Sequence, residues 1–173
     1  MKNILTFILT TFFIAAFATG CRSEQPTDGK KADVINQQES EDVQIPSPWT
    51  DCETVEAAET LAGFDITAPE ALEGYGEKVI SVMDDEIIRI GYYADDETYI
   101  LLRKGKGNED ISGVCTEYEN TEISEINGVE FTLKGNGEKI NLATWTDGDY
   151  SYSVYATMGE SRDFMTYVCE NLK

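Results

Sequence analysis

The chain has 173 residues and a formal charge of −20, with 33 acidic residues, 13 basic residues and no histidine. The lack of histidine removes the Ser-His-Asp and Cys-His nucleophile systems and the common histidine-containing zinc and iron sites. The negative charge argues against nucleic acid and against an anionic membrane surface as partners, because both require a basic face.

The N-terminus carries the pattern of an exported protein. Lys2 precedes an almost wholly apolar run from Ile4 to Phe17, which is too short for a comfortable transmembrane helix. The run ends in Ala-Thr-Gly-Cys at 18–21, and small residues before a cysteine resemble the lipobox of bacterial lipoproteins. The resemblance implies cleavage after Gly20 and lipid on Cys21, which anchors the chain at the outer face of the cytoplasmic membrane. The alternative is an ordinary signal peptide with an incidental cysteine at its end.

A polar segment separates this signal from the rest of the chain. Residues 22–48 consist mainly of Ser, Gln, Glu, Asp, Lys, Pro and Gly. Such a segment buries too little apolar surface to offset its ordering entropy. The sequence therefore predicts a signal peptide over residues 1–20, a lipidated cysteine and disordered acidic tether over 21–48, and a single domain over 49–173.

The domain begins with a short predicted helix. Thr54 suits the N-cap position, and Gly63 suits the end of the helix. Between them, apolar side chains recur at helical spacing. These are Val55, Ala58, Leu61 and Ala62.

Strands follow from residue 78, where the apolar period changes to two. We predict strands at residues 79–83, 87–93 and 98–104, joined by short acidic turns, and then a loop over 105–114 with three glycines. Two more strands, 118–126 and 129–134, flank Asn127-Gly128, a type I′ turn signal.

Residues 140–156 predict the hairpin around which the sheet is organised, because Asp147-Gly148 separates two runs rich in β-branched and aromatic residues. A two-residue loop places Trp145 opposite Tyr150. A three-residue loop is preferred, because it gives one clearly apolar face. That face gathers Ile140, Leu142, Tyr150, Tyr152, Val154 and Ala156. Trp145 and Tyr155 then share the other face, where another element covers them or they lie flat on the sheet. A ligand platform is the less favoured alternative.

The last element is a helix that begins near Ser161. Its apolar stripe, at i, i+3, i+4 and i+7, consists of Met165, Val168, Cys169 and Leu172. The predicted fold is α+β: a curved antiparallel β-meander of about seven strands, with an N-terminal and a C-terminal helix packed on one face.

Five stretches of the domain carry a resemblance to a known family. They are Pro48-Trp49-Thr50-Asp51-Cys52-Glu53-Thr54 followed by Ala57, Ala58 and Glu59, Leu61-Ala62-Gly63-Phe64, Leu101 to Gly107, Asp110 to Gly113, and Ala143 to Tyr152. Together they resemble the domain of unknown function 4367 family, found on Gram-positive lipoproteins and on the outer side of membrane-anchored anti-sigma-like proteins. The resemblance covers nearly all of Trp49 to Leu172 and implies a curved antiparallel sheet with helices. It brings no catalytic residues.

Three cysteines, Cys52, Cys115 and Cys169, follow the lipidation signal. Export places them where disulfides are permitted, and three thiols allow at most one internal bridge. Cys169 belongs to the apolar stripe of the last helix and suits the core. We predict a Cys52–Cys115 bridge, because both residues adjoin segments whose backbone can adjust to bridge geometry.

Arg103, Lys104 and Lys106 form the cationic cluster of a domain with nine basic and 27 acidic residues. They are suited to an acidic partner or a polymer phosphate, although relief of local repulsion is the simpler interpretation. With Trp145 and Tyr155 they are the candidate residues for partner contact.

Metal and catalytic sites are not expected. The acidic turns at 84–86, 95–97 and 147–149 lack the alternating spacing of a calcium loop and are interpreted as solvated turns. Carboxylates are abundant, yet nothing in their spacing selects a pair for glycoside hydrolysis. No metal ion and no cofactor are therefore predicted.

Two functions from different classes remain. We favour a monomeric, membrane-anchored lipoprotein whose non-catalytic binding or sensing domain recognises an unknown envelope protein or polymer through the sheet face or the loop 105–114. The alternative is a small carrier of lipid or another envelope component, or an envelope hydrolase, with a pocket between sheet and helices. A deep apolar cavity with converging polar groups favours the alternative, and a filled core favours the binding domain.

Overall fold

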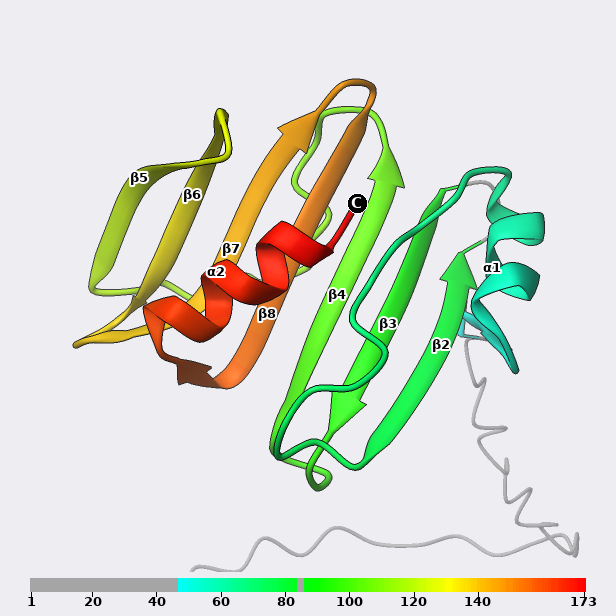
Figure 1. Ribbon diagram of the computed structural model, residues 1–173, viewed down its shortest axis with the longest axis horizontal. Coiled ribbons are helices and arrows are strands. Elements are labelled where there is room, and N and C mark those ends of the chain that lie inside the picture. Colours follow the sequence, from blue (N-terminus) through cyan, green and yellow to red (C-terminus); the bar gives the residue numbers. More distant parts are fainter. Residues whose placement is uncertain (1–46, 84–85) are drawn as a thin grey trace, which may run out of the picture. The chain divides into compact units, whose positions relative to one another are not determined.

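The computed structural model describes residues 47–83 and 86–173 (Figure 1). The predicted signal peptide, Cys21 and all but the last two residues of the predicted tether lie outside these residues. The described strands form one antiparallel sheet of eight strands in the order β1-β2-β3-β4-β8-β7-β6-β5. The strands are β1 (Thr50–Cys52), β2 (Glu77–Met83), β3 (Ile87–Tyr93), β4 (Tyr99–Lys106), β5 (Asn120–Ile126), β6 (Val129–Asn136), β7 (Lys139–Asp147) and β8 (Tyr150–Glu160).

The predicted meander of about seven strands needs two corrections. The sheet has eight strands, because β1 also pairs with β2, and three residues are too few to show a period in the sequence. The order of strands is also not a single meander, since β4 pairs with β8 and not with β5. Residues 107–119 carry the chain from β4 to the other end of the sheet, and β5 to β8 then return to β4.

Both helices pack on one face of the sheet, as predicted. Helix α1 is Val55–Ala62 and helix α2 is Arg162–Asn171. Their buried residues are Ala58 and Ala62 in α1, and Met165, Val168 and Cys169 in α2. They join a single cluster with side chains of the strands, including Ile80, Ile90, Leu102, Val154, Ala143 and Phe131. We call the face with these strand residues the core face and the opposite one the open face.

The predicted cap and stop of α1 and the predicted start of α2 near Ser161 are confirmed. The Thr54 side chain accepts a hydrogen bond from the Ala57 N–H at 3.2 Å, and Ser161 accepts one from the Phe164 N–H at 3.3 Å. Gly63 ends α1 with a φ of 72°, a left-handed conformation that favours glycine. The predicted stripe of α1 is wrong at Leu61, which is 44% exposed.

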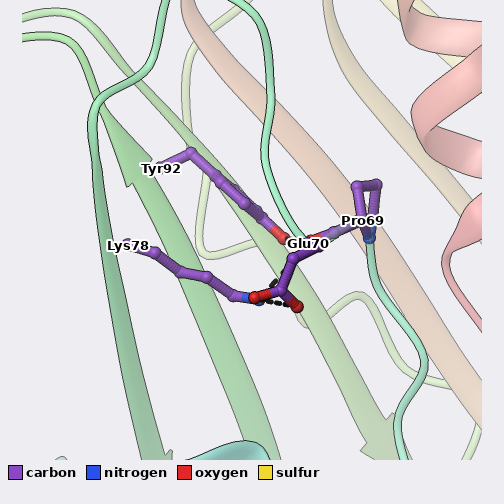
Figure 2. A network of polar contacts seen from close by, with 4 residues as sticks. All are labelled: Pro69, Glu70, Lys78 and Tyr92. Carbon is purple, nitrogen blue, oxygen red and sulfur yellow. Dashed lines mark hydrogen bonds and ion pairs between the residues drawn. The ribbon is translucent and has the colours of Figure 1, made fainter.

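The segment between α1 and β2 is held to the core face by polar contacts. The Tyr92 hydroxyl donates to the Pro69 carbonyl, and the Lys78 Nζ lies 3.4 Å from the same oxygen and 3.8 Å from the Glu70 carboxylate (Figure 2). Backbone hydrogen bonds of 2.7 and 3.0 Å join Thr67 to Lys173. The C-terminus is therefore paired with the segment that follows α1.

The hairpin of β7 and β8 has neither of the two predicted registers. Asp147 lies opposite Tyr150, so the turn is Gly148-Asp149, and Trp145 lies opposite Tyr152. The preferred three-residue loop is therefore wrong. The observed register places Trp145 on the core face, where its ring stacks on Tyr152 with centroids 5.0 Å apart and an interplanar angle of 4°.

A second irregularity in this hairpin explains why the apolar pattern misled the prediction. The register shifts between Ile140 and Leu142, which leaves both residues buried but places them on opposite faces. Asn141 lies at the shift, and its side chain donates to the Ala156 carbonyl at 3.1 Å. The apolar residues of β7 therefore do not share one face.

Candidate functional site

The predicted cationic cluster is divided between the two faces of the sheet, because successive residues of a strand point to opposite sides. Lys104 lies on the core face, is 8% exposed, and places its Nζ 2.7 Å from the Asp65 carbonyl oxygen. Lys106 places its Nζ 3.0 Å from the Ala62 carbonyl oxygen. Arg103 lies on the open face. The three residues therefore do not share one face, and their contact with a partner stays a prediction.

Lys106 serves the end of α1, and Lys104 holds the segment that follows it. The last carbonyls of a helix have no partner within the helix and carry partial negative charge, which a cation stabilises. Helix α1 has no basic residue in its own last turn, and Lys106 supplies the charge from β4. The ammonium of Lys104 lies 4.5 Å from the centre of the Tyr150 ring, in a setting that also includes Phe64 and Tyr152. These contacts connect α1 to the sheet.

Two arginines lie side by side on the open face. Arg89 of β3 is directly opposite Arg103 of β4. The Arg89 Nε donates to the Ser81 hydroxyl at 2.9 Å. The Arg103 Nη1 donates to the Ile111 carbonyl at 2.9 Å and also to the Ser112 carbonyl. Arg103 therefore holds the connection between β4 and β5 against the sheet, while Arg89 keeps its terminal nitrogens without an acceptor among the described residues.

Trp49 covers this arginine pair. The centre of its ring lies 4.2 Å from the Arg89 guanidinium carbon and 5.7 Å from that of Arg103. A guanidinium at such distances is attracted by the negative face of the indole. Trp49 directly precedes β1, so the chain enters the sheet over the two arginines.

No carboxylate is in direct contact with the pair. Within residues 47–83 and 86–173, no acidic side chain lies within 4 Å of either guanidinium, and the buried Nε of Arg103 has no hydrogen-bond partner. Burial lowers the pKa of Arg103, the like charge of Arg89 lowers it further, and the negative charge of Asp110 opposes the shift only in part. Like charges directly opposite each other destabilise a sheet. An anion beside the pair relieves this repulsion, and a planar fork of donors suits carboxylate or phosphate oxygens.

A row of tyrosines extends the open face beside the arginine pair. The rings of Tyr93 and Tyr99 are 5.3 Å apart, and those of Tyr99 and Tyr155 are 6.3 Å apart. Tyr155 is half-buried and lies opposite Leu101, two residues along β4 from Arg103. Of the two aromatic candidates predicted for partner contact, Tyr155 is thus on the face of the arginine pair. Trp145 is on the core face with 7% of its surface exposed.

The sequence interpretation missed Arg89 and the position of Trp49. Arg89 stands in the run Ile87-Ile88-Arg89-Ile90, where an alternating pattern puts it on the side opposite Ile88 and Ile90. A charged residue in an otherwise apolar strand was the available signal. The pairing of Arg89 with Arg103 could not be predicted in the same way, because it depends on the register of β3 and β4.

The described cysteines lie in three different settings. Cys52 is half-buried in β1, Cys115 is exposed in the connection to β5, and Cys169 is buried in α2. Burial raises the pKa of the Cys169 thiol to about 12, and the charge of Glu170 adds to the rise. The core position of Cys169 is confirmed. The Cys52–Cys115 bridge stays a prediction.

No metal site is found in the described part of the chain, where no group of three Cys, Asp or Glu residues is placed to hold an ion. In the turn after β3, which was predicted to be solvated, the carboxylate of Asp95 has a structural role. The Asp95 Oδ1 accepts hydrogen bonds from the N–H groups of Glu97 and Thr98, and these bonds lower the pKa of Asp95. Asp84 and Asp85 lie outside the described residues.

Comparison with known proteins gives one family. Residues 67–165 match the model described as Domain of unknown function (DUF4367). The match includes β2 to β8 and the first residues of α2, and therefore both arginines of the open face. No curated protein and no solved structure matches the chain. No helix in the described ranges has the length and apolar character needed to span a membrane.

Proposed function

The chain belongs to the family named Domain of unknown function (DUF4367), and we propose that it is an extracytoplasmic lipoprotein whose domain binds an anionic group of an envelope protein or polymer without turning it over. The observation that carries the proposal is the Arg89–Arg103 pair, which lies on the open face under Trp49 without a carboxylate within 4 Å among the described residues. The anchor is the lipid predicted on Cys21, and the domain acts as a monomer at the outer face of the cytoplasmic membrane.

The location of these arginines supports an anionic ligand. The domain from residue 49 onward has 27 acidic and nine basic residues, so the electrostatic field of its net negative charge repels anions. Among the described basic residues, Lys106 is engaged with the end of α1 and Lys104 with the segment after it. Lys78 pairs with Glu70, and Arg162 pairs with Glu122. Arg89 differs from these, because its terminal nitrogens remain available at a half-buried site where water screens charge less.

The geometry also suggests how a ligand is held. Arg103 is fixed by two carbonyl oxygens of the connection between β4 and β5, and Arg89 is fixed at one nitrogen by Ser81. The donors are thus oriented before a ligand arrives, which reduces the entropy lost on binding. Trp49 and the row formed by Tyr93, Tyr99 and Tyr155 give an amphipathic rim suited to contact with a protein or a polymer.

The alternative, a carrier or hydrolase, has one observation in its favour. A groove of about 290 Å³ lies between the end of α2 and the strands β6 and β7, and Phe131, Trp145 and Cys169 contribute to its wall. Ligand pockets usually measure about 300–1,000 Å³. The space between sheet and helices is otherwise filled by the core cluster. The binding domain is therefore the better-supported function.

The test is an anion titration of the purified full-length protein in detergent micelles. Inorganic phosphate and glutamate are added separately, and NMR follows the indole N–H of Trp49. Arg89→Gln should weaken the response about tenfold, because charge-assisted hydrogen bonds are lost. Arg162→Gln is the matched control, since Arg162 pairs with Glu122 on another part of the sheet.

Two outcomes contradict the proposal. If neither anion moves the Trp49 signal at millimolar concentration, the arginine pair is not an anion site. If the purified protein hydrolyses peptidoglycan or another envelope glycan, the function is not restricted to binding.

A further inference from the structure

Strand β5 leaves one edge of the sheet open. It stands at the end of the described strands, with β6 as its neighbour on one side (Figure 1). The opposite end of the sheet is β1, which has three residues, whereas β5 has seven. Most residues of β5 are exposed, and Ile123 exposes 68% of its surface. An unpaired edge of this length offers a row of backbone donors and acceptors to another strand.

The register of the β5–β6 hairpin identifies the backbone groups that face outward. Ile126 lies opposite Val129 across the turn Asn127-Gly128, whose φ values of 52° and 83° are those of a type I′ turn. Residues that flank such a two-residue turn bond to each other, and the bonding direction then alternates along the strand. Glu122, Ser124 and Ile126 thus direct their backbone groups toward β6. Thr121, Ile123 and Glu125 direct theirs away from the sheet.

The outward-facing residues also have a distinct side-chain pattern. Glu125 lies directly opposite Glu130, both are exposed, and neither has an ion-pair partner among the described residues. Glu122 differs, because its carboxylate contacts Arg162. Ile123 is the apolar residue between Glu125 and Thr121 on the same side of the strand. The edge therefore combines an uncompensated pair of carboxylates with an exposed β-branched side chain.

We propose that β5 accepts an extended basic segment of another protein as a ninth, antiparallel strand. The incoming strand places Lys or Arg opposite Glu125 and a β-branched apolar residue opposite Ile123. Backbone hydrogen bonds to Thr121, Ile123 and Glu125 supply affinity, and the two opposed side chains supply specificity, as in other complexes formed by strand addition. The cation also relieves the repulsion between Glu125 and Glu130.

Charge favours a basic segment over a second copy of the chain as the partner of β5. Two copies paired through β5 around Ile123 place Thr121 of one opposite Glu125 of the other, so no cation reaches the carboxylates. Each copy also carries a formal charge of −20, which opposes close approach. A basic segment meets neither obstacle. The site is separate from the arginine pair on the open face of β3 and β4, and the two proposals can fail independently.

The probe is the peptide Ser-Lys-Thr-Val-Thr-Thr-Ser, with blocked ends, and its counterpart with Glu in place of Lys. Each is added at millimolar concentration to the full-length protein in detergent micelles, and amide hydrogen exchange is measured by NMR. The lysine peptide should slow exchange at Thr121, Ile123 and Glu125 and leave Ser124 and Ile126 unchanged. The glutamate peptide should bind about tenfold more weakly, because attraction is replaced by repulsion.

A charge reversal separates this interaction from general attraction to an acidic protein. Glu125→Lys should reverse the preference, so that the glutamate peptide binds more tightly than the lysine peptide. Glu97→Lys is the matched control, because Glu97 is exposed in the turn between β3 and β4 and should leave the preference unchanged. The Glu125 variant also removes a like-charge pair, so loss of folding is not expected.

Three results overturn the proposal. The first is unchanged exchange at Thr121, Ile123 and Glu125 with the lysine peptide. The second is equal binding of the two peptides to the wild-type protein. The third is protection of the same amides by the protein itself, with sedimentation that shows a dimer, because the occupant is then a second copy.

Discussion

The Nζ of Lys104 lies 2.7 Å from the carbonyl oxygen of Asp65, which joins the middle of the sheet to the segment after α1. Lys104 belongs to β4, and its ammonium is surrounded by Phe64, Tyr150 and Tyr152. A lysine that is 8% exposed keeps its charge at low cost only where a hydrogen bond and aromatic faces replace water. The cation is therefore part of the core face.

Lys104→Ala should lower the free energy of unfolding by about 2–3 kcal/mol, because it removes a charged hydrogen bond, a cation–π contact and packing. Urea denaturation measures the loss. Lys134→Ala is the control, since the ammonium of Lys134 has no hydrogen bond or ion pair among the described residues, and it should change stability by less than about 0.5 kcal/mol. Equal effects of the two substitutions would show that the contact with Asp65 contributes nothing.

Much of the local structure could be predicted from the sequence. Thr54, Gly63 and Ser161 act on backbone groups within a few residues of themselves, so the helix ends follow from residue type. In the predicted strand 129–134, Phe131 and Leu133 alternate with polar neighbours, and both are buried in the structure. The signals at the helix ends and the strand period are local, so they can be recognised without knowing which distant residues pack against them.

The candidate site could not be predicted in the same way. Arg103 and Lys104 are adjacent in the sequence, yet one holds the connection at Ile111 on the open face and the other holds Asp65 on the core face. Their roles depend on where α1 and the connection cross the sheet. The pairing of β4 with β8 was equally hidden, because a loop as long as residues 107–119 permits several strand orders.

The thiol of Cys169 should make stability depend on alkaline pH. Its pKa is raised to about 12 by burial, from an ordinary value of 9.0, so the folded state retains a proton that the unfolded state loses. The free energy of unfolding should therefore fall as pH rises above about 9, by at most about 1.4 kcal/mol per pH unit from this group. Urea denaturation of wild type and Cys169→Ala at pH 8, 9 and 10 measures the difference. An equal slope in both proteins would exclude Cys169 as its source.

Lipidation of Cys21 is the prediction on which the location depends. Intact mass of the membrane fraction should show a diacylglyceryl group on Cys21, and globomycin should block processing. Cys21→Ala should leave the precursor unprocessed or release the protein. A wild-type protein found soluble in the medium with an unmodified Cys21 would remove the anchor from the proposed function.

The predicted bridge between Cys52 and Cys115 can be tested by peptide mapping without reduction. The bridge should stabilise the domain by roughly 2–4 kcal/mol if its geometry is unstrained. After reduction, Cys115 should react rapidly with iodoacetamide, because it is exposed, and Cys169 should react slowly, because it is buried. A bridge from either residue to Cys169 would contradict both the pairing and the core position of that thiol.

The stack of Trp145 on Tyr152 is the direct consequence of the observed hairpin register. The centroids of the Trp145 and Phe131 rings are also 4.5 Å apart. Trp145 of β7 therefore contacts β6 and β8 on the core face. Trp145→Ala should lower the free energy of unfolding by about 3–5 kcal/mol, because it leaves a cavity among buried rings. Tyr155→Ala should cost less, since Tyr155 is half-buried on the open face. Thermal and urea unfolding give both values, and a greater loss for Tyr155 would indicate that the two faces of this hairpin are exchanged.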